Sequence, residues 1–239
     1  MPLPKIATPT YELELPSTGQ TIEYRPFLVK EEKLLVLALE SENTKEITTA
    51  IKNVIKSCIQ TKGIKVDALP TFDIEYLFLN IRGKSVGEEI EVKITCPDDG
   101  KTQVSVNIPI DEIQIQKNDN HTNKVKLDDD LMMEMKYPSL AEFIKNNFDF
   151  NEENVMDQSF EMIASCIDKI YNAEEVWAAA DCTKKEITTF LESMNTTQFK
   201  EIEKFFETMP KLSHTVKITN PNTKVESEVI MEGLSSFFG

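Results

Sequence analysis

The side chains most able to do chemistry in this sequence are thiols and imidazoles, and their spacing is unfavourable for a metal site. These residues are Cys58, Cys96, Cys166, Cys182, His121 and His214. A structural zinc site takes its thiolates in close pairs, typically Cys-x-x-Cys, and no such pair occurs here. We therefore predict free and mostly buried thiols, with neither a metal nor a cofactor.

One predicted turn looks like half of a zinc knuckle. It consists of Cys96, Pro97, Asp98, Asp99 and Gly100. Asp99 stands where a knuckle needs its second sulfur ligand, and a corresponding turn at Asn220–Thr223 has no sulfur at all. We predict that both are tight turns of β-hairpins, which is compatible with a zinc ribbon that kept its turns and lost its metal.

Other motifs that could indicate catalysis are incomplete. Gly83–Ser85 matches the end of a phosphate-binding loop, but Phe78 stands where that loop needs its first glycine. The acidic run Asp128–Asp130 is typical of a solvated turn. No serine, cysteine or threonine lies in a recognisable nucleophile motif. We therefore predict that the protein is not an enzyme.

The composition is that of a soluble globular protein with an acidic surface. The chain has 239 residues, 40% of them hydrophobic, and a net charge of −15, which opposes binding to nucleic acid. The longest apolar run, Leu34–Leu39, is far shorter than the roughly 18 residues that a membrane span needs. The N-terminus lacks a signal-type apolar stretch. We expect no membrane association and a cytosolic location at synthesis.

Apolar periodicity predicts hairpins and amphipathic helices in the first half of the chain. The predicted strands are Tyr11–Leu15, Gln20–Tyr24, Ile90–Ile94 and Val104–Ile108. The predicted helices are Val29–Ser41, Ile47–Ile59 and Phe72–Ile81. The last of these helices is apolar on nearly every side, so we expect it to be central to the fold.

The second half shows the same two periodicities. The predicted strands are Lys124–Leu127, Leu131–Tyr137 and the two arms of a last hairpin between His214 and Met231. The predicted helices are Leu140–Asn146, Val155–Tyr171, Ile187–Met194 and Phe199–Met209. The fold class is therefore α+β, with amphipathic helices packed against several short antiparallel hairpins. We expect one region over residues 1–120 and a second over 121–239, unless they form one continuous domain.

A short internal match suggests a duplication. Val92–Thr95 and Val216–Thr219 both read Val-Lys-Ile-Thr, and each is followed by a residue and then a proline. A repeated helix–helix–hairpin unit over residues 44–117 and 183–232 would explain the match. The alternative is that separate hairpins reuse the same strand-forming residues.

Several segments resemble the baseplate hub proteins of T-even-type contractile-tail phages. They are Tyr11–Gly19, Tyr24–Lys33, Asp73–Gly87, the turn Cys96–Gly100 and the closing segment Glu232–Phe238. The resemblance implies a late viral protein that is built into the baseplate hub or helps to assemble it, with other hub or tail proteins as partners. It carries over no catalytic residues.

The residues agree with a binding role, because hairpins offer strand edges to other subunits. The predicted contact residues are Tyr24, Arg25 and Phe27, then Cys96, Pro97, Asp98, Asp99 and Gly100, and in the tail Leu234, Phe237 and Phe238. Arg25 is suited to hold a carboxylate, within the fold or across an interface. The tail aromatics could instead pack on the chain's own sheet. We expect Arg25→Ala, or truncation after Gly233, to weaken partner binding without unfolding the chain.

Two roles remain open at this point. The first is a non-enzymatic component or assembly factor of the hub, in the host cytoplasm during assembly and in the virion tail baseplate if structural. The alternative is a transient cytosolic chaperone that shields tail or hub proteins and is absent from the virion. The sequence also leaves the oligomeric state open, a homo-oligomer included.

Overall fold

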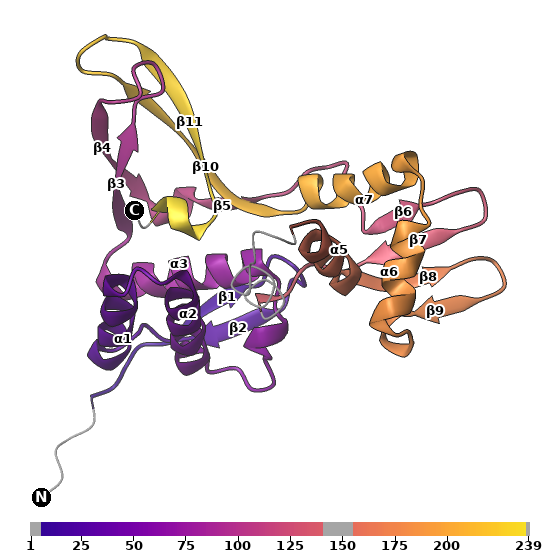
Figure 1. Cartoon of the computed structure of the whole chain (residues 1–239). Coiled ribbons are helices and arrows are strands. Elements are labelled where there is room, and N and C mark those ends of the chain that lie inside the picture. Colours follow the sequence, from indigo (N-terminus) through magenta and orange to yellow (C-terminus); the bar gives the residue numbers. More distant parts are fainter. Residues whose placement is uncertain (1–5, 141–154, 238–239) are drawn as a thin grey trace, which may run out of the picture. The chain divides into compact units, whose positions relative to one another are not determined.

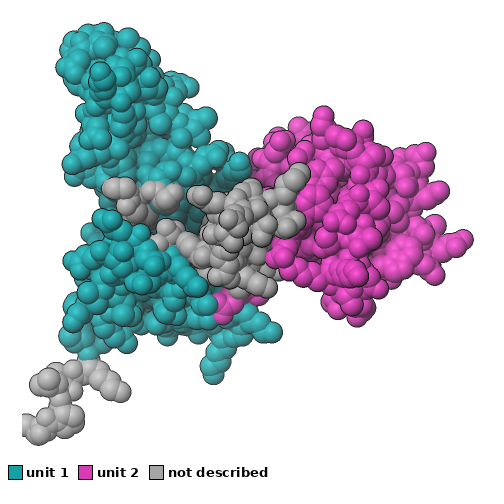
Figure 2. Space-filling view, in the orientation of Figure 1, with its two compact units in different colours: residues 1–66, 72–116, 211–239 teal, residues 67–71, 117–210 magenta. Residues whose placement is uncertain are grey.

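The computed structural model describes residues 6–140 and 155–237, which form two compact units (Figure 1). Unit 1 comprises residues 1–66, 72–116 and 211–239, and unit 2 comprises residues 67–71 and 117–210 (Figure 2). These units differ from the two predicted regions, which meet at residue 120. The C-terminal hairpin shares its core with residues of the first half of the chain, so it belongs to unit 1. The helix predicted at Leu140–Asn146 lies outside the described residues, apart from its first residue.

Unit 1 contains the elements of both ends of the chain, and its predicted helices and hairpins are confirmed. In chain order they are β1 (Tyr11–Glu14), β2 (Thr21–Tyr24), α1 (Val29–Glu40), α2 (Thr44–Cys58), α3 (Thr71–Val86), β3 (Glu89–Thr95), β4 (Gln103–Pro109), η2 (Ile110–Glu112), β5 (Gln114–Gln116), β10 (Lys211–Thr219), β11 (Glu226–Glu232) and η5 (Leu234–Phe237). The short helix η1 (Val66–Ala68) precedes α3.

Two small sheets share one apolar core in unit 1. The hairpin β3–β4 forms one sheet, and β11, β10 and β5 form the other in that order. Along β3 every second residue is buried, namely Ile90, Val92 and Ile94, as the alternating pattern predicts. These side chains belong to the same core as Val216 and Ile218 of β10. The two hairpins with the matching sequence are therefore packing partners.

Helix α3 is buried on most of its circumference, as its apolar sequence predicts. Its buried residues include Phe72, Ile74, Leu77, Phe78, Leu79 and Ile81. The helix continues through Gly83 and ends at Val86, five residues beyond its predicted end at Ile81. A Cβ atom at Gly83 would lie 3.0 Å from the side chain of Ile110, so the glycine allows η2 to approach the helix closely.

Unit 2 packs helices on a four-stranded antiparallel sheet. Its elements are β6 (Lys124–Lys126), β7 (Met132–Met135), α5 (Val155–Ser165), β8 (Ile167–Tyr171), β9 (Val176–Ala178), η4 (Ala179–Asp181), α6 (Lys184–Glu192) and α7 (Thr196–Thr208), and the strand order is β6-β7-β8-β9. The buried methionines Met133 and Met135 share a core with Ile163, Leu191 and Phe205 from the three helices.

The helix predicted over Val155–Tyr171 is wrong in its second half. Helix α5 ends at Ser165, and β8 begins at Ile167. Ile167 and Ile170 are three residues apart, which is a helical spacing, but they pair with Met135 and Met133, which are two residues apart. A β-bulge between these pairs places both isoleucines against the core, and a bulge imitates helical spacing in the sequence.

Three hairpins turn in the same way, which clarifies the internal match. In each turn the fifth residue donates its N–H to the carbonyl of the first, at 2.8 Å from Gly19 to Leu15, 2.9 Å from Gly100 to Cys96 and 2.9 Å from Lys224 to Asn220. Proline follows the first residue in all three, and the fifth residue has a positive φ between 63° and 69°.

The likeness between the two predicted repeats is therefore a likeness of hairpins. Helices α6 and α7 belong to unit 2, whereas the hairpin β10–β11 that follows them belongs to unit 1. Helices α2 and α3 lie in the same unit as their hairpin. The helix–helix–hairpin segments thus do not form equivalent compact units. No helix in the described ranges is long and apolar enough to cross a membrane.

The shared turn predicts opposite effects of two substitutions. A positive φ costs an L-residue roughly 1–2 kcal/mol, whereas glycine adopts it freely but loses more chain entropy. We expect Lys224→Gly to raise the free energy of unfolding of unit 1 by about 0.5 kcal/mol and Gly100→Ala to lower it by about 1 kcal/mol. Urea unfolding monitored on hairpin amide signals measures both. A Lys224→Gly variant that is less stable than the wild type would contradict the positive φ of Lys224.

Candidate partner-binding surface

The tips of the two packed hairpins are joined by hydrogen bonds. The Asp98 carboxylate accepts hydrogen bonds from Nδ2 of Asn220 at 3.0 and 3.1 Å, and also one from the hydroxyl of Thr223. The hydrogen bonds from Asn220, which has the larger effect, and from Thr223 hold the pKa of Asp98 below its usual value. Nδ2 of Asn222 donates to Thr102 at 3.0 Å. The two turns thus contact each other through the side chains of Asp98, Thr102, Asn220, Asn222 and Thr223.

The rest of the predicted tip is also engaged within the hairpin. Asp99 accepts the backbone N–H groups of Lys101 and Thr102, both at 2.9 Å, and the Thr102 hydroxyl, which together lower its pKa. Cys96 is buried. Burial is the main cause that raises the pKa of its thiol, and the nearby carboxylates of Asp98 and Asp99 raise it further. Pro97, Asp98 and Gly100 stay exposed. In residues 6–140 and 155–237, no group of three potential ligands is placed to hold a metal ion.

The thiols and imidazoles have structural surroundings. Cys58, Cys96 and Cys166 are buried and free, as predicted, and Cys182 is partly exposed. His121 contacts the hydroxyls of Thr208 at 2.9 Å and Tyr137 at 3.0 Å, one with each ring nitrogen. Burial lowers the pKa of His121, so the ring is neutral at pH 7.

Arg25 holds a carboxylate within the fold, the first of the two arrangements considered for it. Its guanidinium lies 3.0 Å from Glu31, whose other oxygen accepts the N–H of Leu28 at 2.7 Å and so caps α1. Glu31 is only 2% exposed. Burial acts to raise the pKa of Glu31, but the hydrogen bonds from Arg25 and Leu28 outweigh it and leave the pKa below its ordinary value. Tyr24, which precedes Arg25 in the sequence, is buried, and Phe27 is half-buried.

The tail packs on the chain's own core. Phe237 is 1% exposed and belongs to the core shared by the two sheets. The N–H of Leu234 donates to the carboxylate of Glu75 on α3 at 3.1 Å, and burial raises the pKa of Glu75 despite this bond. Phe238 lies outside the described residues. In this structure Phe237 is therefore a core residue, which is the second of the two arrangements predicted for the tail.

A surface that the sequence analysis did not assign to function lies on α1. The exposed apolar residues on and before this helix are 41–80% exposed, and they are Leu28, Val29, Leu34, Val36, Leu37 and Leu39. Within the helix only Glu31 and Ala38 are buried. The signal was present in the sequence, because a helix has 3.6 residues per turn and cannot bury six consecutive apolar residues on one side.

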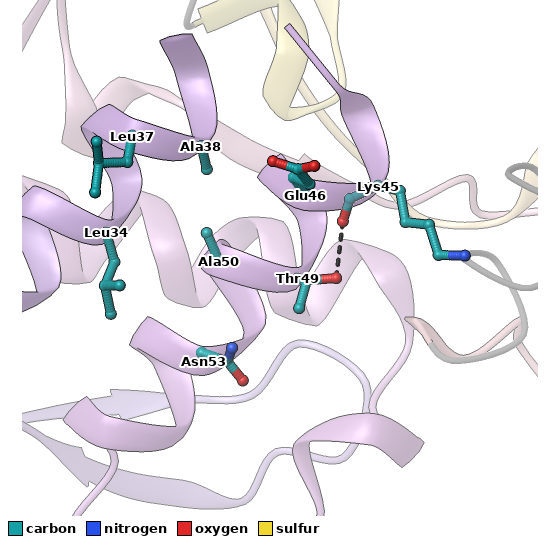
Figure 3. A pocket seen from close by; sticks show the side chains of 8 residues that line it. All are labelled: Leu34, Leu37, Ala38, Lys45, Glu46, Thr49, Ala50 and Asn53. Carbon is teal, nitrogen blue, oxygen red and sulfur yellow. Dashed lines mark hydrogen bonds between the residues drawn. The ribbon is translucent and has the colours of Figure 1, made fainter. Parts of the chain in front are cut away.

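Part of this surface forms a groove between α1 and α2 (Figure 3). Its volume is about 450 Å³, and it is lined by Leu34, Leu37, Ala38, Lys45, Glu46, Thr49, Ala50 and Asn53. Figure 3 shows the leucines of α1 and Ala50 of α2 on the two sides of the groove. The hydroxyl of Thr49 donates to the carbonyl of Lys45 at 2.7 Å. The lining offers apolar contacts with a few polar groups, which suits binding rather than catalysis.

The Arg25–Glu31 pair predicts a pH effect on stability. A carboxylate whose pKa is lowered by folding stabilises the folded state above its ordinary pKa of 4.5, and this contribution is lost as the pH falls through the folded value. Wild-type unit 1 should therefore lose stability more steeply below about pH 4.5 than Glu31→Gln does. At pH 7, Arg25→Ala should lower the free energy of unfolding by about 2 kcal/mol.

The exposed pair Lys217–Glu228, at 3.1 Å, provides the control. Lys217→Ala should change the free energy of unfolding by less than about 0.5 kcal/mol, because exposed ion pairs contribute little. Equal losses in the free energy of unfolding from Arg25→Ala and Lys217→Ala would show that the buried pair stabilises the fold no more than the exposed pair does.

The buried tail predicts that Phe237→Ala destabilises unit 1. Removing a buried phenylalanine side chain costs about 3–5 kcal/mol in transfer and cavity terms. Thermal unfolding should show a clear loss, and truncation after Gly233 should be at least as severe. This differs from the expectation that truncation would leave the chain folded, because Phe237 is in the core. A truncated chain of wild-type stability would contradict this placement.

Comparison with known proteins gives one match. No curated protein and no solved structure is significantly similar to the chain. The family described as T4 bacteriophage base plate protein matches residues 8–239, which is nearly the whole chain and includes the helix pair, both packed hairpins and the tail. The chain therefore belongs to the T4 bacteriophage base plate protein family.

Proposed function

We propose that this baseplate protein is a non-enzymatic subunit or assembly factor of the baseplate hub, and that it acts by binding other hub or tail proteins. The family supports a role in the baseplate. The observation that carries the binding role is the set of half-exposed leucines and valines on α1. Contiguous exposed apolar side chains are typical of protein interaction sites.

The joined hairpin tips are a second contact element in this proposal. Pro97, Asp98 and Gly100 are exposed there, and the hydrogen bonds between the turns fix their positions. Among the other predicted contacts, Arg25 and Tyr24 support the start of α1 from within the fold, and Phe27 is half-buried at the same place. These residues position the α1 surface.

A transient chaperone remains the second candidate, and the same observation favours it. A chaperone that shields apolar tail proteins needs an exposed apolar surface of its own, and α1 provides one. The two roles differ in stoichiometry, because a structural subunit stays in the finished particle and a chaperone leaves it.

Quantitative peptide mass spectrometry on purified virions and on infected-cell lysate separates the two roles. We expect a fixed, small copy number in the virion. A tail structural protein and an abundant host cytosolic protein serve as positive and negative controls for the purification. Abundance in the lysate with absence from the virion would contradict the structural role and establish the transient one.

A further inference from the structure

We propose that the free edge of strand β11 binds an extended segment of a partner protein by strand addition, and that this segment is basic on its exposed face. The inference deepens the proposed function and rests on it in one respect, since the partner is taken to be another phage tail protein. The recognition chemistry is argued from β11 and its neighbours alone.

Strand β11 offers a long edge to another strand. It has seven residues, or about 24 Å at 3.4 Å per residue. It lies at one end of the sheet β11-β10-β5, in the yellow hairpin of Figure 1. Among the described residues, β11 pairs with β10 alone. A strand that is paired on one side is a template for an extended peptide on the other.

The ladder between β10 and β11 shows which backbone groups point to the free edge. The N–H of Asn220 donates to Val225, and that of Gly233 donates to Leu212, both at 2.9 Å. Hydrogen-bonded and non-hydrogen-bonded pairs alternate along an antiparallel ladder. The groups that point away from β10 are therefore those of Glu226, Glu228, Ile230 and Glu232. The hydroxyl of Ser236 occupies one of them, because it donates to the carbonyl of Glu232 at 2.6 Å.

The side chains of β11 define what an added strand would meet. Those of the four edge-facing residues are exposed, and Ile230 among them is 65% exposed. The alternate side chains of Ser227, Val229 and Met231 are partly or fully buried, and Val229 and Met231 contribute to the core of the two sheets. An added strand would therefore face three carboxylates and one isoleucine on its exposed side, and would extend the core on its other side.

The charges at this edge favour a basic partner. Strand β11 contains three glutamates and no lysine. Two of these glutamates have lysine neighbours on β10, with Lys217 at 3.1 Å from Glu228 and Lys211 at 3.7 Å from Glu232. With every lysine of the two packed hairpins included, residues 89–109 and 211–232 contain five lysines and seven carboxylates, a formal charge of −2. The edge, the hairpins and the whole chain at −15 thus all attract positive charge.

The same charges disfavour a second copy of this chain as the occupant. A two-fold contact would set one β11 antiparallel to another. Every such register that aligns three or more of the edge-facing residues places glutamate directly opposite glutamate, which is destabilising. Two chains of charge −15 also repel each other as wholes. A basic segment of a different protein avoids both penalties.

Two peptides that match the length of β11 test the inference on the full chain. One reads Lys-Thr-Val-Val-Lys-Thr-Lys, which in the antiparallel arrangement sets a lysine opposite each glutamate and a valine opposite Ile230. The other has glutamate in place of each lysine. We expect the lysine peptide to bind at least about tenfold more tightly at low salt, with the difference shrinking as salt screens the charges.

Amide hydrogen exchange gives a readout that is specific to strand addition. The N–H groups of Glu226, Glu228 and Ile230 point away from β10, so they should exchange quickly in the free protein. Binding of the lysine peptide should slow their exchange at least about tenfold. The N–H of Val229 belongs to a pair that is bonded to β10 in both states, so it serves as the internal reference.

Two charge reversals form a matched pair of variants. Glu226→Lys lies on β11, and Glu91→Lys changes an exposed residue of β3. Both change the net charge of the chain equally. Glu226→Lys should weaken the lysine peptide at least about threefold and strengthen the glutamate peptide, whereas Glu91→Lys should leave both within about twofold.

Two proline substitutions test the backbone contacts. Ile230→Pro removes an N–H that points to the free edge, and proline is tolerated at such positions. Ser105→Pro makes the same change on β4, where the hydrogen bond from Cys96 to Thr102 at 2.7 Å sets the alternation. Ile230→Pro should weaken the lysine peptide at least about fivefold, and Ser105→Pro should leave it within about twofold. Circular dichroism and thermal unfolding check that both fold. If one does not, the charge reversals decide.

Several outcomes would overturn the inference. They are binding of neither peptide, equal binding of both, binding of the lysine peptide without slower exchange along β11, and equal losses from Glu226→Lys and Glu91→Lys. Self-association in sedimentation that Ile230→Pro abolishes would also overturn it, and would identify the edge as a contact between copies. None of these results bears on presence in the virion, so the proposed function is tested separately by mass spectrometry.

Discussion

The burial of helix α3 is the constraint on which the rest of unit 1 depends. A helix that is apolar on most of its surface must be covered on most of its surface, and the polar and small residues of α3 are where the covering segments attach. Four contacts show this: Asp73 accepts the N–H of Ser17 at 3.0 Å, Glu75 accepts that of Leu234 at 3.1 Å, Gly83 admits Ile110, and the hydroxyl of Ser85 accepts the N–H of Phe27 at 2.9 Å. The first hairpin turn, the segment before α1, the short helix η2 and the tail thus all meet one helix.

This arrangement leaves α1 with little to cover. The helix is fixed at its start by the Arg25–Glu31 pair and along its length by contact with α2, and it buries only Glu31 and Ala38. Leu34, Val36, Leu37 and Leu39 remain about half exposed and Val29 is 80% exposed, which is unfavourable in water for an isolated chain. In the proposed function a partner covers this surface, and membership in a family of baseplate proteins supports a setting in which such partners are present.

Local patterns predicted most of the elements but not how distant ones combine. Alternation in β3 and periodicity in α2, α6 and α7 depend on neighbouring residues, and the structure confirms them. The bulge at β8 gives Ile167 and Ile170 a helical spacing, so the sequence pattern predicts a helix where the chain forms a strand. The core between β3–β4 and β10–β11 joins segments more than 100 residues apart, which periodicity does not register. The α1 surface was visible as the run Leu34–Leu39, but a run of apolar residues is read as core until its neighbours are known.

Unit 1 therefore presents two surfaces of different chemistry. At the hairpin tips, hydrogen bonds lower the pKa values of Asp98 and Asp99, so both carboxylates stay charged at neutral pH and the tip is acidic. Along α1 and α2 the formal charge is zero and the exposed side chains are largely apolar. Hydrogen bonds between the turns link the two tips to each other. A protein with one acidic and one apolar surface can discriminate between two kinds of partner. The acidic tips repel acidic partners and attract basic ones, whereas the apolar side chains of α1 favour partners with apolar surface to bury.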